Sequence, residues 1–254
     1  MAENISVHIR LYASYREQAG RDHIDVALAS GGAVAQAIEQ LLVDVPSLPK
    51  AFKPHLIAVN DEFANTAYPL NDGDEIALYP PVSGGVDVKV THDVIDVAAI
   101  ADAVRRDSNG AVVTFEGTTR NETEGEPVLH LEYEADERMA EKVLAQVLEE
   151  TAVRFGVPHM AARHRVGRLE IGEVSLVVTA AAPHRLEAFL AAQYAVDRIK
   201  HIVPVWKKEF FQNGSVWVGA ACEPEHHAQE LAEAPYASFL ASREGPATHA
   251  HTHA

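Results

Sequence analysis

Three observations in the sequence predict an α+β protein with two domains. Apolar residues alternate with polar ones in several short segments, as in half-buried strands. Between these segments, apolar residues recur at three- and four-residue spacings, as on the buried face of a helix. The first set of patterns ends at Pro80-Pro81, because proline lacks the donor that a strand ladder needs, and a new alternation starts at Val86. We therefore expect domains at residues 1–85 and 86–222, followed by a weakly patterned, partly disordered tail at 223–254.

The first domain is predicted to be a small sheet with one helix. The alternation of Ile5, Val7 and Ile9 opens it with a strand. A helix pattern follows Gly31-Gly32, and the run from Asn71 to Asp74 marks a turn before the last strand. The expected order is strand, strand, helix, strand, strand, with strands at 5–11, 24–28, 56–59 and 75–79 and the helix at 34–42.

The second domain is predicted to mix more strands with three helices. Asn213-Gly214 between two apolar segments is a strong signal for a hairpin. The strands are expected at 86–90, 112–115, 128–133, 161–166, 174–180, 205–211 and 215–218, and the helices at 93–106, at 136–155 and after Pro183. The large apolar residues of the last two helices are expected to face inward: Met139, Val143, Val147 and Leu148, then Leu186, Phe189, Leu190, Val196 and Ile199.

Composition narrows the class of protein. The net charge of −16 argues against a general nucleic-acid binder, because such proteins usually carry a basic face. No apolar run approaches the roughly 18 residues that span a bilayer, and residues 1–10 lack the features of a signal peptide. One cysteine, Cys222, excludes an internal disulfide framework, so we expect a cytoplasmic protein. We predict no metal site, and assign no role to the alternating tail histidines His249, His251 and His253.

Residues 80–85, PPVSGG, lie where the first pattern ends. Gly84 and Gly85 carry no side chains, so such a segment can thread a narrow channel and bring its carbonyl to a buried substrate. The other interpretation is a turn or an interdomain hinge. A tail that reacts through its last carbonyl would need a free terminal carboxylate, yet Val86 follows here directly.

Residues 1–85 resemble the small subunit of molybdopterin synthase, MoaD, a ubiquitin-like β-grasp sulfur carrier. The matching segments are RLYASYREQAG, VNDEFA and LNDGDEIALYPPVSGG. Residues 86–222 resemble the large, catalytic subunit, MoaE, which implies an α/β hammerhead-type domain. Its matching segments are GAVVTFEGTTRN, LEYEA, HRVGRLEIGE, APHRLEAF and IKHIVPVWKKE.

The resemblance implies a reaction of molybdenum cofactor biosynthesis. The terminal glycine, here Gly85, would carry sulfur as a thiocarboxylate, loaded by a MoeB-like adenylating enzyme and a sulfur donor. The large subunit would bind cyclic pyranopterin monophosphate (precursor Z), and two sulfur transfers would make the dithiolene without a resident cofactor. The resemblance also implies a homodimer through the second domain, or a heterotetramer after cleavage, with no nucleic acid or membrane partner. The sequence has no nucleotide-binding glycine loop, so adenylation must come from another protein.

Two lysines are the candidate catalytic residues. Lys200 is expected near the end of a helix, and Pro204 then redirects the chain into the strand that carries Lys207, so one pocket could hold both ammonium groups. There they could bind phosphate, stabilise an oxyanion or act in proton transfer. The alternative for Lys200 is a solvated cation that complements the negative end of the helix. Lys208 should face away from Lys207 on a regular strand, so a substrate-pocket role and a structural role stay open for it.

The resemblance assigns other residues to the substrate. Arg120, in a polar loop, would contact the phosphate or pterin; the alternative is a surface arginine. His184 and Arg185 start a helix, where backbone donors favour an anion, and the family uses them across its dimer interface; a capping histidine is the alternative. Phe115 and Trp206 could wall the pterin site or belong to the core. His164 and Arg165 match the family but are interpreted as structural or secondary.

Two functional hypotheses follow from the internal Gly-Gly. In the first, cleavage between Gly85 and Val86 frees the carrier tail and the chain acts as molybdopterin synthase. In the second, the ubiquitin-like domain stays uncut as a structural or regulatory module, and a separate carrier delivers the sulfur. A weaker third possibility is conjugation of the cut tail to lysines.

Overall fold

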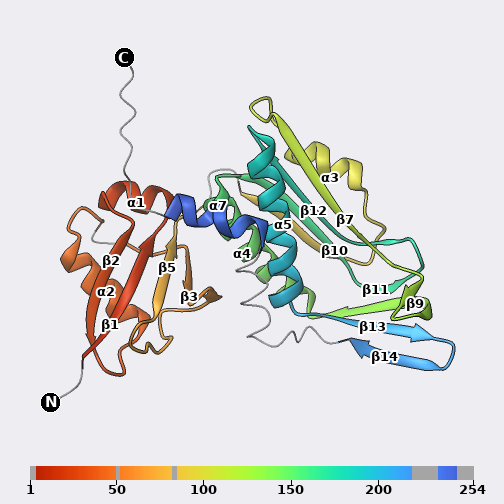
Figure 1. Cartoon of the computed structure of the whole chain (residues 1–254), viewed down its shortest axis with the longest axis horizontal. Coiled ribbons are helices and arrows are strands. Elements are labelled where there is room, and N and C mark those ends of the chain that lie inside the picture. Colours follow the sequence, from red (N-terminus) through yellow and green to blue (C-terminus); the bar gives the residue numbers. More distant parts are fainter. Residues whose placement is uncertain (1–3, 50–51, 82–84, 219–233, 245–254) are drawn as a thin grey trace. The chain divides into compact units, whose positions relative to one another are not determined.

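A computed structural model of the chain describes residues 4–49, 52–81, 85–218 and 234–244. The chain divides into two compact units, Met1–Ser83 and Gly84–Ala254 (Figure 1). Gly84 of the predicted carrier tail, Cys222 and the tail histidines His249, His251 and His253 lie outside the described residues. Among the helices that the structure describes, none has the length and apolar character needed to cross a membrane.

The first unit is a β-grasp, as the sequence predicts. Its mixed sheet has the order β2-β1-β5-β3-β4, with β1 and β5 parallel and the other pairs antiparallel. The strands are β1 (Asn4–Leu11), β2 (His23–Ala29), β3 (Leu56–Val59), β4 (Glu62–Phe63) and β5 (Glu75–Tyr79). The helices are α1 (Ala13–Ala19) and α2 (Val34–Asp44). The sequence patterns did not reveal α1 or the two-residue β4.

The core of the first unit follows from the alternation in β1. Ile5, Val7 and Ile9 are buried, whereas the residues between them are exposed. They pack in one cluster with the buried face of α2, which includes Val34 and Leu41. Burial of these apolar side chains supplies the main driving force for folding of the unit.

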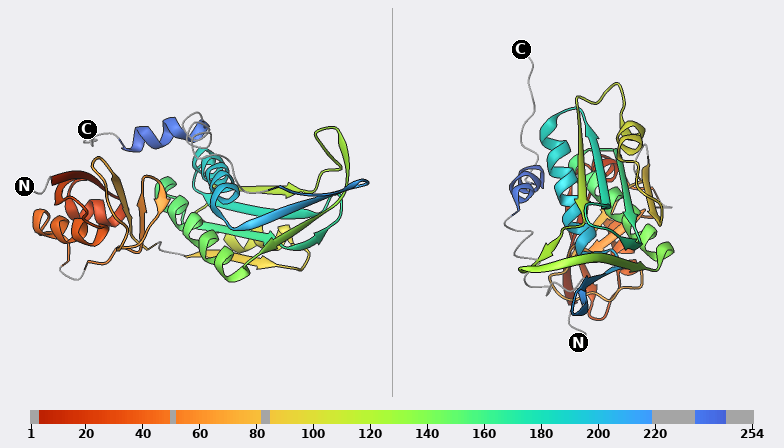
Figure 2. Two further views of the ribbon diagram at one scale, coloured as in Figure 1. Left: turned by 90° about the horizontal axis from the view of Figure 1, so that it is seen from below. Right: turned by 90° about the vertical axis from the view of Figure 1, so that its right-hand side faces the viewer.

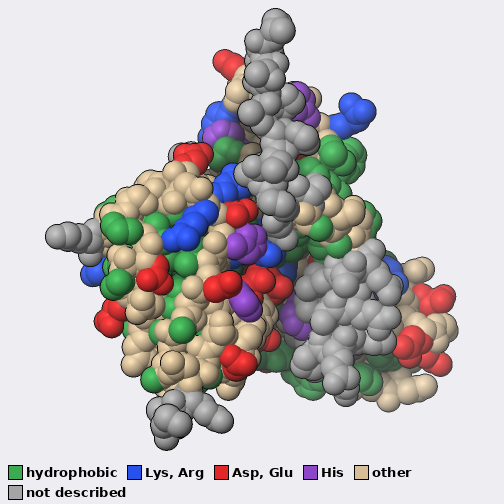
Figure 3. Space-filling model, turned by 60° about the vertical axis from the view of Figure 1, so that its left-hand side comes forward, with side chains coloured by type: hydrophobic (Ala, Val, Ile, Leu, Met, Phe, Trp, Pro, Cys, Tyr) green, Lys and Arg blue, Asp and Glu red, His purple; other side chains and the backbone are tan. Residues whose placement is uncertain are grey.

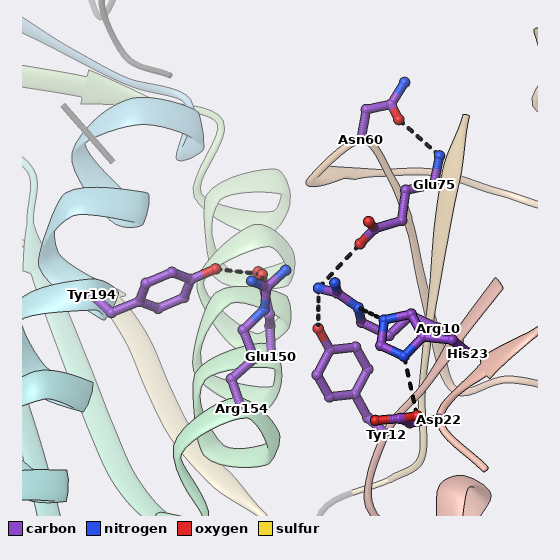
Figure 4. Close-up of polar contacts among 9 residues, drawn as sticks. All are labelled: Arg10, Tyr12, Asp22, His23, Asn60, Glu75, Glu150, Arg154 and Tyr194. Atoms are coloured by element: carbon purple, nitrogen blue, oxygen red, sulfur yellow. Dashed lines mark hydrogen bonds and ion pairs between the residues drawn. The ribbon is translucent and has the colours of Figure 1, made fainter. Parts of the chain in front are cut away.

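A polar network ties three strands of this sheet together (Figure 4). Arg10 Nε of β1 donates to His23 Nε2 of β2 over 3.1 Å, and Arg10 Nη1 lies 3.2 Å from Glu75 Oε1 of β5. His23 Nδ1 in turn lies 3.1 Å from Asp22 Oδ1. On the face drawn in Figure 3, the described side chains include acidic, basic and histidine groups.

The second unit is built on a four-stranded sheet with the order β6-β10-β12-β7. β6 and β10 are parallel, and the other two pairs are antiparallel. The strands are β6 (Val86–Thr91), β7 (Ala111–Thr118), β10 (His159–Arg165) and β12 (Val174–Ala182). The helices α4 (Glu137–Phe155) and α5 (Arg185–Ile202) lie side by side against this sheet, and α3 (Val97–Val104) packs on it separately (Figures 1 and 2).

Strand alternation assigns the helices to opposite faces of this sheet. Ala161 and Val177 pack with Ile100 of α3 in one core cluster. Their neighbours along the strands therefore point to the other face, where α4 and α5 lie. This second face carries His164 of β10 and Phe115 of β7, which are cross-strand neighbours of Leu176 and Val178 in β12.

The prediction of inward-facing residues was wrong for three side chains. Met139, Leu186 and Phe189 are 56%, 54% and 61% exposed. On α5 the predicted residues Leu190, Val196 and Ile199 are buried, together with four alanines that let the helix approach the sheet closely, whereas Leu186 and Phe189 lie off this face. On α4 the buried face runs through Ala140 and Leu144 instead of Met139.

A second, antiparallel sheet has the order β11-β9-β13-β14, with β8 paired to β9. The predicted hairpin is confirmed, because β13 and β14 pair across the turn that precedes Gly214. The strands are β8 (Glu122–Thr123), β9 (Glu126–Ala135), β11 (Gly167–Leu169), β13 (Val205–Phe211) and β14 (Gly214–Val218).

A buried network joins α4 to α5 (Figure 4). Glu150 is fully buried and accepts from the Tyr194 hydroxyl over 2.6 Å. Its carboxylate also lies 3.0 Å from Arg154 Nε and 3.4 Å from Arg198 Nη2. Burial raises the pKa of Tyr194 well above its usual value, so the hydroxyl stays protonated as the donor.

The tail region contains a helix that the sequence patterns did not predict, α7 (Pro235–Glu244). The Tyr236 hydroxyl donates to Asp197 Oδ2 of α5 over 3.1 Å. The Tyr236 ring meets Tyr194 edge-on, and Phe239 stacks on Phe155 with centroids 5.6 Å apart. Aromatic contacts therefore attach α7 to α4 and α5.

Candidate functional site

A cavity of about 360 Å³ lies in the second unit, where the end of α5 meets both sheets. It is of the size that small-molecule sites have. The lining comes from α5 and the segment after it and from strands of both sheets: Phe115, Gly117, Thr118, Tyr133, His164, Ser175, Leu176, Ile199, Lys200, Val203, Val205 and Lys207.

The two predicted catalytic lysines both line this cavity. Lys200 is in the last turn of α5, which ends at Ile202, and β13 starts at Val205. Pro204 stands between them and redirects the chain, because proline cannot continue a helix. The short connection brings Lys207 of β13 to the same space as Lys200.

A buried carboxylate holds Lys207. Lys207 Nζ lies 2.7 Å from Glu209 Oε1, and the Glu209 side chain is only 3% exposed. Residues two apart on a strand share a face, so Glu209 lies beside Lys207 on the same side of β13, although it is not part of the cavity lining. Sequence reasoning missed this residue, although the K-x-E spacing within a predicted strand is a usable signal for such a pair.

Phe115 and Lys200 interact across the cavity. Lys200 Nζ lies 5.5 Å from the centroid of the Phe115 ring, within the range of a cation–π contact. A side chain at Gly117 would crowd this ring, since a Cβ there would lie 3.3 Å from Phe115 Cε1. Phe115 therefore forms part of the cavity wall, as one of its two interpretations suggested.

His164 also lines the cavity, although the sequence suggested a structural or secondary role. Its side chain is almost fully buried, and burial lowers its pKa below the usual value. The Nδ1 atom lies 2.9 Å from the Arg165 carbonyl oxygen, and the ring meets Tyr133 edge-on.

The outer face of β13 carries a different set of groups. Lys208 Nζ lies 5.1 Å from the ring centroids of both Phe210 and Trp217. Trp206 shares this face by alternation and is exposed. Neither Lys208 nor Trp206 lines the cavity, so the structure brings neither to the two lysines.

Arg120, His184 and Arg185 are exposed and lie outside the cavity lining of the described chain. His184 is the N-cap of α5, with extended backbone and no side-chain cap bond, and Arg185 is the first helical residue. Arg185 and Lys200 are at opposite ends of α5, about 22 Å apart along its axis at 1.5 Å per residue. One copy of α5 cannot bring both residues to one site.

Gly85 is anchored at a distance from the cavity. It has a φ of +68°, a conformation that glycine adopts without strain, and Val86 begins β6 directly after it. Val86 is paired with Met160, whereas Val90 is paired with His164, so the start of β6 is about 13 Å along the sheet from the level of His164. In the uncut chain, β6 pairing keeps Gly85 away from the cavity of its own unit.

No group of three or more His, Cys, Asp or Glu residues that could hold a metal ion is found among the residues that the structure describes.

These features define a class of protein in which a ubiquitin-like β-grasp unit, followed directly by Gly84-Gly85, is fused to an α+β unit with a two-lysine cavity. A family model described as "ThiS family" matches residues 9–85, and one described as "MoaE protein" matches residues 90–202. The molybdopterin synthase catalytic subunit of Halalkalibacterium halodurans is 44% identical over 129 residues, which cover 51% of this chain and 83% of that protein. The Bacillus subtilis catalytic subunit is 41% identical over 135 residues, which cover 53% and 86%.

A solved structure of molybdopterin synthase from Staphylococcus aureus is similar to the second unit, with a TM-score of 0.50 and 37% identity. The match covers 52% of this chain and 96% of that one. The chain therefore belongs to the molybdopterin synthase family, which acts in molybdenum cofactor biosynthesis, and it combines a MoaD-like unit with a MoaE unit in one polypeptide.

Proposed function

We propose that this chain is a molybdopterin synthase that becomes active after cleavage between Gly85 and Val86. Gly85 then carries a thiocarboxylate, and the two-lysine cavity binds cyclic pyranopterin monophosphate and receives the sulfur. The observation that carries this proposal is that Lys200 and Lys207 line one cavity in a chain whose β-grasp unit ends in Gly-Gly. The chain is on this view a sulfurtransferase of the cytoplasm.

The bonds formed and broken in the sulfur transfer can be accounted for without a resident cofactor. The thiocarboxylate sulfur attacks a substrate carbon and displaces an oxygen substituent, which leaves as water or as a phosphate oxygen, and a thioester then joins Gly85 to the substrate. Water then hydrolyses the thioester, returns Gly85 as a carboxylate and leaves the sulfur on the substrate. The Lys200 and Lys207 ammonium groups stabilise the oxyanion that forms during hydrolysis.

Cleavage is required for a chemical and a geometric reason. Activation needs a carboxylate oxygen to attack a nucleotide phosphate, and the Gly85–Val86 amide offers none. In addition, pairing of Val86 with Met160 anchors Gly85 about 13 Å along the sheet from His164 in the cavity wall. Cutting removes this anchor and frees the tail to enter a cavity.

The proposal includes partners. A MoeB-like adenylating enzyme and a sulfur donor load Gly85. The second units form a homodimer, and the cut chain forms a heterotetramer. The separation of Arg185 from Lys200 by about 22 Å supports the dimer, because Arg185 can serve only the cavity of another copy. Arg120, His184 and Arg185 are then the anion-binding residues of the assembled site.

Intact mass of the protein isolated from its own cells tests the cleavage. We expect two fragments, one ending at Gly85 and the other starting at Val86. Detection of the full-length chain alone, in cells that make active cofactor, would refute cleavage. Uncut protein from a foreign host would not, because that host can lack the protease.

The second candidate is the uncut fusion, in which the β-grasp unit is a structural or regulatory module. It is favoured by the direct entry of Val86 into β6, which is a stable continuation of the chain. Replacing Gly85 separates the two hypotheses. No atom lies within 4 Å of a Cβ built at this position, but the φ of +68° strains any side chain there, so Gly85→Ala is compared with the wild type only where thermal melting shows an unchanged fold. The synthase predicts loss of cofactor production in cells, and the module predicts little change.

A further inference from the structure

The lysine cavity contains a buried histidine that the proposed chemistry does not use. His164 lies on the face of β10 that is turned toward α4 and α5, and its side chain is 7% exposed. It lines the cavity together with Lys200 and Lys207. A buried imidazole beside two ammonium groups has a defined hydrogen-bonding role only if its tautomer is known.

The tautomer follows from the contact at Nδ1. This atom lies 2.9 Å from the carbonyl oxygen of Arg165, and a carbonyl can only accept, so Nδ1 carries the hydrogen. In the neutral ring, Nε2 then has a free lone pair. Burial lowers the pKa of His164 and so favours the neutral form. Within the described part of the chain, no hydrogen bond to Nε2 is formed.

The other polar groups of the cavity differ from His164 in whether they donate or accept hydrogen bonds. Lys200 and Lys207 only donate, and Ser175 Oγ donates to the Gly117 carbonyl over 3.0 Å. The hydroxyls of Tyr133 and Thr118 can turn to donate or accept. Among the described lining side chains, His164 alone offers an acceptor nitrogen.

We propose that His164 is a substrate-contacting residue whose Nε2 accepts a hydrogen bond from an N–H group of the pterin ring. This inference rests on the proposed function and assigns one contact within its substrate site. The lysines hold the anionic and carbonyl groups of the substrate, and His164 fixes the orientation of the ring between them. Tyr133 supports the imidazole edge-on, with ring centroids 5.2 Å apart.

Two isosteres of His164 separate a substrate contact from a structural role. The amide of His164→Asn reaches the position of Nδ1 and keeps the bond to Arg165, but it leaves the position of Nε2 empty. The amide of His164→Gln reaches the position of Nε2 and offers an oxygen acceptor there, but it loses the bond to Arg165. If His164 contacts the substrate, His164→Gln should therefore bind it more tightly than His164→Asn. If His164 has a structural role, His164→Asn should bind it more tightly than His164→Gln.

The experiment measures the affinity of the full chain for cyclic pyranopterin monophosphate by anaerobic equilibrium dialysis, with thermal melting to verify folding. We expect His164→Asn to bind about tenfold more weakly than the wild type, and His164→Gln to stay within about threefold of it. The matched control is His130→Asn, which removes an imidazole that stacks on Phe210 outside the cavity lining and should leave the affinity unchanged.

Wild-type affinity in His164→Asn, or weaker binding by Gln than by Asn, would overturn the inference while the proposed function stands. A wild-type chain that does not bind the pterin would overturn both. If the variants do not fold, ¹⁵N-histidine spectra of the wild type decide the matter. The Nε2 resonance of His164 must shift when the pterin is added, and an unchanged resonance refutes the contact.

Discussion

Lys207 and Lys208 are neighbours in one strand, yet β13 places them in opposite environments. Lys207 lines the cavity and is paired with the buried carboxylate of Glu209 at 2.7 Å. Lys208 lies on the outer face, 5.1 Å from the ring centroids of Phe210 and Trp217. The same type of side chain thus belongs to the cavity lining at one position and to a surface aromatic cluster at the next. This difference comes from the strand, because successive side chains point to opposite faces of the sheet. The residue type is the same at both positions and cannot explain it.

The largest expected effect is the loss of the Lys207 ammonium group. Lys207→Met keeps the length of the side chain but removes the charge that stabilises the oxyanion in the proposed reaction. We expect the rate of sulfur transfer to fall by about 10²-fold or more, in line with the removal of one oxyanion donor. The measurement is single-turnover conversion of cyclic pyranopterin monophosphate by the thiocarboxylated protein. A fall of less than threefold would mean that Lys207 is not at the reacting atoms.

An intermediate effect is expected from Glu209, which acts through Lys207. Glu209→Gln keeps the shape and one acceptor but removes the charge that fixes the ammonium group. We expect about a tenfold loss of rate, together with destabilisation of about 1–3 kcal/mol, because a buried pair loses one charged partner. Urea unfolding and single-turnover kinetics measure the two effects.

A double variant, Lys207→Met combined with Glu209→Gln, tests whether Glu209 acts only through Lys207. If Glu209 acts only by positioning Lys207, the double variant should be no slower than Lys207→Met alone. An additional tenfold loss in the double variant would show that the carboxylate has a separate role.

The two faces of β13 also show how far the sequence could predict this site. Alternation placed Lys207 and Lys208 on opposite faces, and Pro204 suggested one pocket for Lys200 and Lys207, which both line the cavity. The contributions of His164 and Tyr133 were not predictable in this way, because they depend on pairing of strands that are distant in sequence. Glu209 was missed because a charged residue in a strand is usually exposed.

The fold shows the same division between local and non-local information. Alternation revealed β1, and the Asn213-Gly214 turn revealed the hairpin of β13 and β14. Leu190, Val196 and Ile199 were correctly expected inside, but Met139, Leu186 and Phe189 are exposed, because part of the buried face of α5 is formed by small alanines that a search for large apolar residues passes over. The helix α7 escaped notice because Tyr236 is buried by contacts with residues distant in sequence, Asp197 and Tyr194 of α5 and Phe155 of α4.

The smallest expected effect is at Lys208. Lys208→Met removes a partly exposed cation from the Phe210 and Trp217 rings and retains an apolar side chain against them. We expect destabilisation of about 0.5–1 kcal/mol, the usual strength of such a contact near the surface, and a rate of sulfur transfer within twofold of the wild type. Thermal melting and the same single-turnover assay measure these effects. If this variant lost as much activity as Lys207→Met, the outer face of β13 would have to contact substrate or a partner subunit in the assembled enzyme. The contrast between the two lysines would then come from the assembly and not from the strand alone.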